Sequence, residues 1–119
     1  MSDDFYCDSI LNGRVPVSVV AETGNVLAFH HVFQTWDTHI VVIPKRHVRS
    51  LAEVEDPELL AELFQVVTRV IREHGFDRSN YKVIVNGGSY QSNQHLHIHV
   101  VSGKPLSPEY PAAKGELAV

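Results

Sequence analysis

The chain has 119 residues, of which 44% are hydrophobic and 20% charged, and its formal net charge is -4. This length suits one compact domain with its own core, and the apolar fraction excludes a disordered chain. No apolar run approaches the ~20 residues that a membrane-spanning helix needs, so we expect no membrane partner. A sequence pI near 6.0 argues against nucleic-acid binding, which usually shows as a basic patch.

The cysteine and histidine content narrows the class of protein further. A single cysteine, Cys7, allows no internal disulfide, which is typical of a reducing compartment. The first residues, Met1–Asp4, are acidic and do not form a secretion signal, so we expect a cytoplasmic protein. The histidine content is unusually high, with eight histidines compared with ten lysines and arginines together. Because histidine exchanges protons near neutral pH and ligates metals, the positions of the eight are informative.

The first half of the chain predicts a short helix and then strands. In chain order these elements are a short helix or turn over 4–12 and strands over 15–21, 26–32 and 40–43. Thr23–Asn25 separates two β-branched runs, which is typical of a β-hairpin. Pro44 ends the strand over 40–43.

The clearest element of the second half is a long helix. Asp56 can cap it, Pro57 occupies the tolerated first position, and Gly75 ends it. Between Leu59 and Val70, leucine and valine recur at helical spacing and predict a face that packs on the core.

Two more strands are predicted over 81–85 and 95–101, after which 102–119 contains several prolines and glycines. About five strands and one long helix, joined by hairpins rather than helical crossovers, predict an antiparallel α+β domain. We assign residues 1–101 to this domain and 102–119 to an extended C-terminal tail.

Segment 95–101, with the sequence HLHIHVV, contains the most informative pattern. Because side chains alternate between the faces of a strand, His95, His97 and His99 would project from one face while the apolar residues enter the core. Three imidazoles along roughly 13 Å of one strand face indicate a functional site. They could hold a metal, or one imidazole could be a nucleophile beside neighbours that bind an anion.

The surroundings of this segment favour the anion. No acidic residue occurs between Tyr81 and Lys104, whereas a carboxylate there would repel phosphate. The preceding loop, 86–94, offers backbone N–H, amide and hydroxyl donors next to the histidines.

Segment 95–101 resembles the His-φ-His-φ-His-φ-φ signature of the histidine triad (HIT) family, where φ is an apolar residue. Three further blocks, 26–30, 38–47 and 85–86 with 91–92, resemble the Hint branch of that family in order and spacing. The resemblance extends from about Tyr6 to Val101. It implies a HIT-like α+β fold and a homodimer that pairs across a two-fold axis.

The resemblance also implies an activity, the transfer of a nucleotidyl group to water. His97 would attack the α-phosphorus of a nucleoside 5'-phosphoramidate or a related nucleotide conjugate, and water would hydrolyse the nucleotidyl-histidine. His95 and His99 would contact the phosphate or the leaving group, with His39 as a fourth histidine beside them. The residues implied to contact a purine nucleotide are Phe29, His30, His31, Val32, Asn86, Gln91, Ser92 and Asn93. Since a relative usually has an acidic residue where this chain has His31, we expect a shifted substrate.

The implied mechanism requires no cofactor, because oriented hydrogen-bond donors can stabilise the transferring phosphorus. Some bacterial relatives carry a structural zinc site, however, and the corresponding residues here are Asp4, Cys7, His47 and His95. We expect this site to be lost, with a Cys-Asp-His-His zinc site as the alternative. Two alternative functions also remain, a dinucleoside polyphosphate hydrolase and a nucleotide-binding module with little catalysis.

Overall fold

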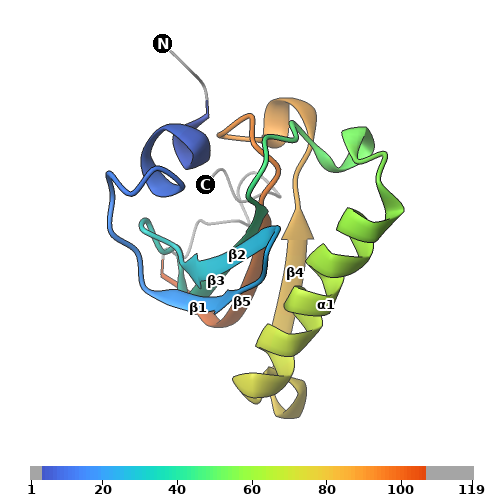
Figure 1. The fold of residues 1–119 in the computed structure, drawn as a ribbon. Helices are drawn as coiled ribbons and strands as arrows, with labels where there is room; N and C mark the ends of the chain where they lie inside the picture. Colours follow the sequence, from blue (N-terminus) through green and yellow to red (C-terminus); the bar gives the residue numbers. More distant parts are fainter. Residues whose placement is uncertain (1–3, 107–119) are drawn as a thin grey trace.

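The computed structural model describes residues 4–106, which form one five-stranded antiparallel sheet with a long helix against it (Figure 1). The order of the strands in the sheet is β1-β2-β3-β5-β4. Their bounds are β1 (Val19–Glu22), β2 (Val26–His30), β3 (Trp36–Pro44), β4 (Tyr81–Val85) and β5 (Ile98–Pro105). The predicted α+β class, with five antiparallel strands and one long helix, is confirmed.

Helix α1 (Pro57–Glu73) covers one face of this sheet. The Asp56 side chain accepts a hydrogen bond from the backbone N–H of Glu58 at 2.9 Å, as the capping pattern predicted. Gly75 follows the helix with φ of 70°, a left-handed conformation that favours glycine. The residues of the helix and the sheet that form this shared core include Leu59, Leu63, Val66, Val70, Val26, Ala28, Ile40, Val42, Ile98 and Val100.

A short N-terminal turn covers the opposite face of the sheet (Figure 1). This turn is the π-helical segment η1 (Tyr6–Ile10), which agrees with the helix or turn predicted over 4–12. Tyr6 and Ile10 are buried against the second set of sheet side chains, which comprises Leu27, Phe29, Val41 and Ile43. Alternation along β2 and β3 therefore separates two cores, one under α1 and one under the N-terminal turn.

The last strand differs from the prediction over 95–101. β5 begins at Ile98, because the backbone N–H of Leu96 donates to the carbonyl of Val48 at 2.7 Å and the carbonyl of His95 accepts from a side chain. β5 then continues to Pro105, so the first residues of the predicted tail belong to the sheet. The rest of that tail, 107–119, lies outside the described residues.

The other predicted strands are present, but some of them begin or end at residues other than those predicted. β1 begins at Val19 rather than at residue 15, and β3 is longer than the predicted strand over 40–43. Strand β4 has the predicted bounds. None of the helices in the described part of the chain combines the length and the apolar character needed to cross a membrane.

Candidate active site

Four histidines meet on the sheet face opposite α1, and we call His31, His39, His97 and His99 the four-histidine centre. The register of β3 and β5 pairs Val41 with His99 and His39 with Val101, which brings two of the rings together. The His31 ring follows β2 and lies 4.5 Å from that of His39, while the rings of His97 and His99 are 5.0 Å apart, measured between ring centroids. All four side chains are buried.

The tautomers of His39 and His99 follow from a backbone donor. The N–H of Thr35 donates to Nδ1 of His39 at 3.1 Å, so neutral His39 carries its proton on Nε2. That Nε2–H donates to Nδ1 of His99 at 2.8 Å, which leaves the proton of His99 on its own Nε2. Nε2 of His99 is buried and has no hydrogen-bond partner among the described residues. A buried donor without a partner costs about 1–3 kcal/mol, and an oxygen of a bound ligand would satisfy it.

In His97 the positions of the proton and the lone pair are reversed, and the lone pair on Nε2 is available. Its Nδ1–H donates to the backbone carbonyl of His95 at 2.6 Å, so the unprotonated nitrogen is Nε2. Nε2 has no hydrogen bond to any residue that the structure describes. His97 is 3% exposed, whereas His95 and His99 are fully buried, so only this ring of the triad reaches the surface. The geometry is that of an imidazole nucleophile.

Burial keeps the four-histidine centre uncharged near neutral pH. It lowers the pKa of His31 to about 4 and that of His39 to about 3, with a smaller effect from the neighbouring histidines. The pKa of His99 is also well below its usual range, and burial lowers the pKa of His97 too. In the free protein these groups are therefore neutral donors and acceptors, and Nε2 of His97 stays unprotonated.

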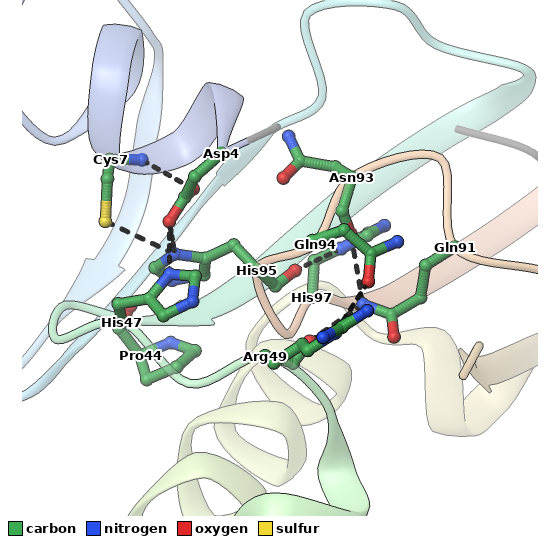
Figure 2. A network of polar contacts seen from close by, with 10 residues as sticks. All are labelled: Asp4, Cys7, Pro44, His47, Arg49, Gln91, Asn93, Gln94, His95 and His97. Atoms are coloured by element: carbon green, nitrogen blue, oxygen red, sulfur yellow. Dashed lines mark hydrogen bonds and ion pairs between the residues drawn. The ribbon is translucent and has the colours of Figure 1, made fainter. Parts of the chain in front are cut away.

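The His95 side chain lies in a separate group, although the sequence predicted that it would share a face with His97 and His99 (Figure 2). Its Nε2–H donates to the carbonyl of Pro44 at 2.8 Å. Its Nδ1 faces the carboxylate of Asp4 at 2.9 Å and the sulfur of Cys7 at 3.5 Å. The reason is that β5 begins only at Ile98, so strand alternation does not govern His95. To the four-histidine centre, His95 contributes its backbone carbonyl.

We call Asp4, Cys7, His47 and His95 the Asp4 cluster, and these are the residues that the zinc alternative named. Nδ1 of His47 also contacts the Asp4 carboxylate, and the backbone N–H of Cys7 donates to that carboxylate at 2.9 Å. Burial alone would raise the pKa of Asp4, but its hydrogen bonds outweigh this effect and hold the pKa well below its usual value. Burial and the neighbouring carboxylate raise the pKa of the Cys7 thiol to about 12.

The Asp4 cluster fits a metal ion. One nitrogen, oxygen or sulfur atom from each of its residues lies within 4.8 Å of the others, and this donor set suits zinc. Because Nε2–H of His95 is bound to a carbonyl, the lone pair on Nδ1 faces the Asp4 carboxylate, and a proton or a metal ion must lie between them. His47 lines a surface hollow of about 580 Å³, which gives the cluster a route to solvent.

A second group, His31, His39 and His99, is equally close together but does not fit a metal. Nδ1 of His31 accepts the N–H of Phe33 at 2.9 Å, and Nδ1 of His39 accepts that of Thr35. A metal on Nε2 of a neutral ring would require a proton on Nδ1, where it would face a backbone N–H. The backbone around this group therefore favours protons over metal ions.

The predicted nucleotide-binding residues of the loop before β5 take different positions. The amide nitrogen of Gln91 donates to the carbonyls of Arg49 and Asn93 at 2.9 and 3.0 Å, so it holds the loop in place. Asn93 is buried with its side-chain oxygen unpartnered among the described residues, whereas Ser92 is exposed and Asn86 half-buried.

The predicted residues around β2 are also divided. Phe29 and Val32 belong to the core under the N-terminal turn, on the same face as the triad. His30 points to the face under α1, where its ring centroid lies 6.4 Å from that of His74, so the structure does not bring it to the site. Strand alternation places neighbouring residues on opposite faces, which explains the difference from Phe29.

Sequence reasoning missed Tyr6, whose ring lies 5.2 Å from that of His97 and 5.7 Å from that of His95. The only signal in the sequence is its position between Asp4 and Cys7.

A five-stranded α+β domain with this arrangement of histidines defines a protein of the histidine triad class. The HIT domain family matches residues 12–106, and the chain belongs to this family. A 13.2 kDa HIT-like protein from Azospirillum brasilense is 38% identical over 105 residues, which cover 83% of this chain and 85% of that protein.

Two solved structures support the same assignment. A histidine triad protein from Clostridium difficile is 35% identical, with a TM-score of 0.76 over 90% of this chain and 96% of its own. A HIT family hydrolase from Legionella pneumophila Philadelphia 1 is 29% identical, with a TM-score of 0.76 over 91% and 97% of the two chains.

The buried histidines predict that the protein loses stability in mild acid. In the fold, His31 and His39 stay neutral until the pH approaches about 4 and about 3, whereas in the unfolded chain they bind protons below about pH 6.5. The unfolded state then binds more protons, so the free energy of unfolding falls as the pH falls from about 6.5 toward 4. Between about pH 7 and 5.5 these two residues account for a loss of roughly 2–3 kcal/mol.

Urea denaturation at the two pH values measures this loss. A His31→Asn variant is expected to show a loss smaller by roughly 1 kcal/mol, since one of the two groups is gone. An unfolding free energy that is equal at both pH values in the unmodified protein contradicts the neutral state of these histidines.

Proposed function

We propose that the chain is a Hint-like nucleotide hydrolase that cleaves a nucleoside 5'-phosphoramidate or a related purine nucleotide conjugate. One observation supports it above the others. Nε2 of His97 has an unbonded lone pair, and Nε2–H of His99 is a buried donor without a partner in the described part of the chain. A nucleophile next to an unsatisfied donor is what the transfer of a phosphoryl centre requires.

In the first step of the proposed mechanism, Nε2 of His97 forms a bond to the α-phosphorus and the bond to the leaving group breaks. The imidazole becomes cationic while it keeps the proton on Nδ1, and the His95 carbonyl at 2.6 Å stabilises that charge. The leaving amine takes up a proton from solvent as it departs. In the second step water displaces His97, its hydroxyl bonds to the phosphorus, and its other proton returns to solvent. Nε2–H of His99 donates to a phosphoryl oxygen throughout.

The relatives support a hydrolase of this family, since the Legionella protein is named a HIT family hydrolase. Neutral His31 offers a hydrogen-bond donor on Nε2, because its Nδ1 accepts the N–H of Phe33. Relatives usually have an acidic residue, which is an acceptor, at the position of His31. A donor there supports a substrate that differs from theirs, as the sequence predicts. The single cysteine supports the cytoplasm as the place of the reaction.

We also propose, in place of the loss expected from the sequence, that the Asp4 cluster holds zinc as a structural ion, with no part in the transfer. The support is the donor set, the carbonyl partner of His95 Nε2–H and the route to solvent at His47. When bound, the ion supplies a fixed positive charge that joins the N-terminal turn to the loops around Pro44 and His95. The hydrolysis itself requires no cofactor.

A homodimer is a further proposal, with β4 and α1 at the interface. Within residues 4–106, β4 lies at an edge of the sheet and pairs only with β5, so its outer backbone groups are available to a second strand. Tyr81 and Val83 of β4 and Leu60 and Phe64 of α1 are large exposed apolar residues. Exposed apolar side chains next to an unpaired edge favour association with a second copy.

Replacement of the nucleophile is the direct test of the proposed reaction. We expect His97→Ala to lower kcat for a purine nucleoside 5'-phosphoramidate by about a thousandfold or more, because the covalent route is lost. Mononucleotide binding, measured by calorimetry, should change little, and His74→Ala outside the site should retain the activity. With the unmodified protein, mass spectrometry of a rapidly quenched reaction should show an added nucleotidyl group.

The outcomes separate the alternatives. Normal turnover by His97→Ala contradicts the assigned nucleophile. A protein that binds mononucleotides but shows neither turnover nor adduct is a binding module. A higher kcat/KM for a dinucleoside polyphosphate than for the phosphoramidate identifies the alternative hydrolase.

Elemental analysis after equilibration with zinc and removal of the excess tests the metal proposal. We expect about one zinc per chain, and close to none in an Asp4→Ala, Cys7→Ser double variant, because half of the ligands are missing. Asp8→Ala is the matched control, since Asp8 is an exposed acidic residue of the same turn. Equal zinc content in the unmodified protein and the double variant contradicts the site.

Light scattering coupled to size-exclusion chromatography tests the dimer. The unmodified protein should have about twice the chain mass of 13.3 kDa. Val83→Asp should give monomers, because a charge would be buried at the interface. Val19→Asp is the control, since Val19 is 52% exposed on β1 at the other edge of the sheet. Dissociation by Val19→Asp but not by Val83→Asp places the interface elsewhere and contradicts the proposal.

A further inference from the structure

The N-terminal turn contacts both the Asp4 cluster and the four-histidine centre. Asp4 and Cys7 direct their side chains to the nitrogen of His95 (Figure 2). Tyr6, which lies between them in the sequence, packs against His97 with ring centroids 5.2 Å apart and an angle of 46° between the planes. One short segment therefore connects a candidate metal site to the candidate nucleophile.

The ring of His97 needs such a neighbour. The hydrogen bond from Nδ1–H to the His95 carbonyl holds one edge of the ring, whereas the opposite edge, with Nε2, has no hydrogen bond to any described residue. Packing must hold that edge in place, and the rings of Tyr6 and His99 lie beside His97, with centroid distances of 5.2 and 5.0 Å. The rate of nucleophilic attack depends on the position of the attacking nitrogen, because a misplacement of about 1 Å can lower the rate about a hundredfold.

Tyr6 is itself held at several points. Its ring is 3% exposed and packs edge-on against Phe29, with centroids 6.1 Å apart and an angle of 60°. The turn that carries it has only five residues, too few for a helix that is stable by itself. Other attachments of the turn include the packing of Phe5 and Ile10 in the core and the contacts of Asp4 with His95 and His47. The position of Tyr6 therefore depends on the Asp4 cluster.

We propose that residues 4–11 form a clamp, in which attachment at the Asp4 cluster holds Tyr6 against His97 and so sets the direction of the nucleophilic nitrogen. Tyr6 is a positioning residue in this arrangement and touches no reacting atom. A metal ion in the Asp4 cluster would tighten the clamp without taking part in the transfer. The effect on rate rests on the proposed hydrolase function, whereas the effect on the His97 ring does not.

Three variants of the turn test the clamp. Tyr6→Leu keeps an apolar side chain in the core but removes the planar wall, Tyr6→Phe keeps the wall, and Phe5→Leu makes the same change one residue away. Phe5 packs against Phe33 at 6.4 Å and edge-on against Tyr6 at 5.8 Å, but among the described residues its ring does not contact that of His97. Circular dichroism and urea denaturation first show which of the variants are folded.

The first readout is the side-chain nitrogen NMR spectrum of the histidines, which needs no substrate. In the unmodified protein, in Tyr6→Phe and in Phe5→Leu, we expect a slowly exchanging Nδ1–H signal for His97. Tyr6→Leu should broaden or lose that signal while the signals of His39 and His99 persist. An unchanged His97 signal in a folded Tyr6→Leu variant overturns the proposal.

The second readout is kinetic. We expect Tyr6→Leu to lower kcat for the phosphoramidate by about ten- to a hundredfold with KM within about threefold, because the nucleophile is misdirected rather than the ligand lost. Tyr6→Phe and Phe5→Leu should stay within about threefold of the unmodified protein. A lowered kcat in Phe5→Leu equal to that in Tyr6→Leu overturns the specific role of Tyr6. If the unmodified protein binds nucleotides without turnover, the proposed hydrolase fails, and the NMR result alone decides on the clamp.

The third readout concerns the attachment. After treatment with a chelator, addition of zinc alone should slow hydrogen exchange of the backbone amides of residues 5–11 and sharpen the His97 Nδ1–H signal. Asp4→Ala should abolish both responses, and Asp8→Ala should retain them. Zinc that binds without changing the exchange of these amides or the His97 signal overturns the connection between the cluster and the nucleophile.

Discussion

The hydrogen bond from Nδ1–H of His97 to the backbone carbonyl of His95 is the interaction on which the candidate site depends. It directs the proton of His97 to one nitrogen and leaves the other nitrogen with an available lone pair. It also uses the carbonyl of a residue whose side chain lies in the Asp4 cluster. A single backbone carbonyl therefore links the two groups of histidines, and together with the hydrogen bond from Leu96 to Val48 it delays the start of β5 to Ile98.

The backbone also separates histidines that are close in sequence into two chemical types. Where a backbone N–H faces Nδ1, as at His31 and His39, the ring keeps a proton on Nε2 and acts as a neutral donor. Where a carbonyl faces Nε2, as at His95, the lone pair of Nδ1 is directed to Asp4 and Cys7. One cluster is therefore suited to bind an anionic ligand through N–H groups, and the other to hold a cation.

The sequence predicted those elements whose signals are local. The cap at Asp56, the apolar stripe and Gly75 determine α1, and the β-branched run over 81–85 determines β4. The start of β5 could not be predicted, because it depends on the carbonyl of Val48, which lies far away in the sequence. For the same reason the ring of His95 was expected beside His97. His30 was expected at the site because of the family resemblance, whereas strand alternation turns it to the face under α1.

By itself the sequence determined the α+β class and the face on which His97 and His99 lie, because these follow from periodicity. The four candidate metal ligands came from the resemblance to the HIT family. Tertiary structure alone decided the tautomer of each histidine, the separation of His95 from the other two and the place of Tyr6 against the nucleophile. The physical reason is that a histidine nitrogen takes its role from the group that faces it. That group comes from a distant part of the chain, as with Pro44 and Thr35, or from a neighbouring carbonyl whose direction the fold sets.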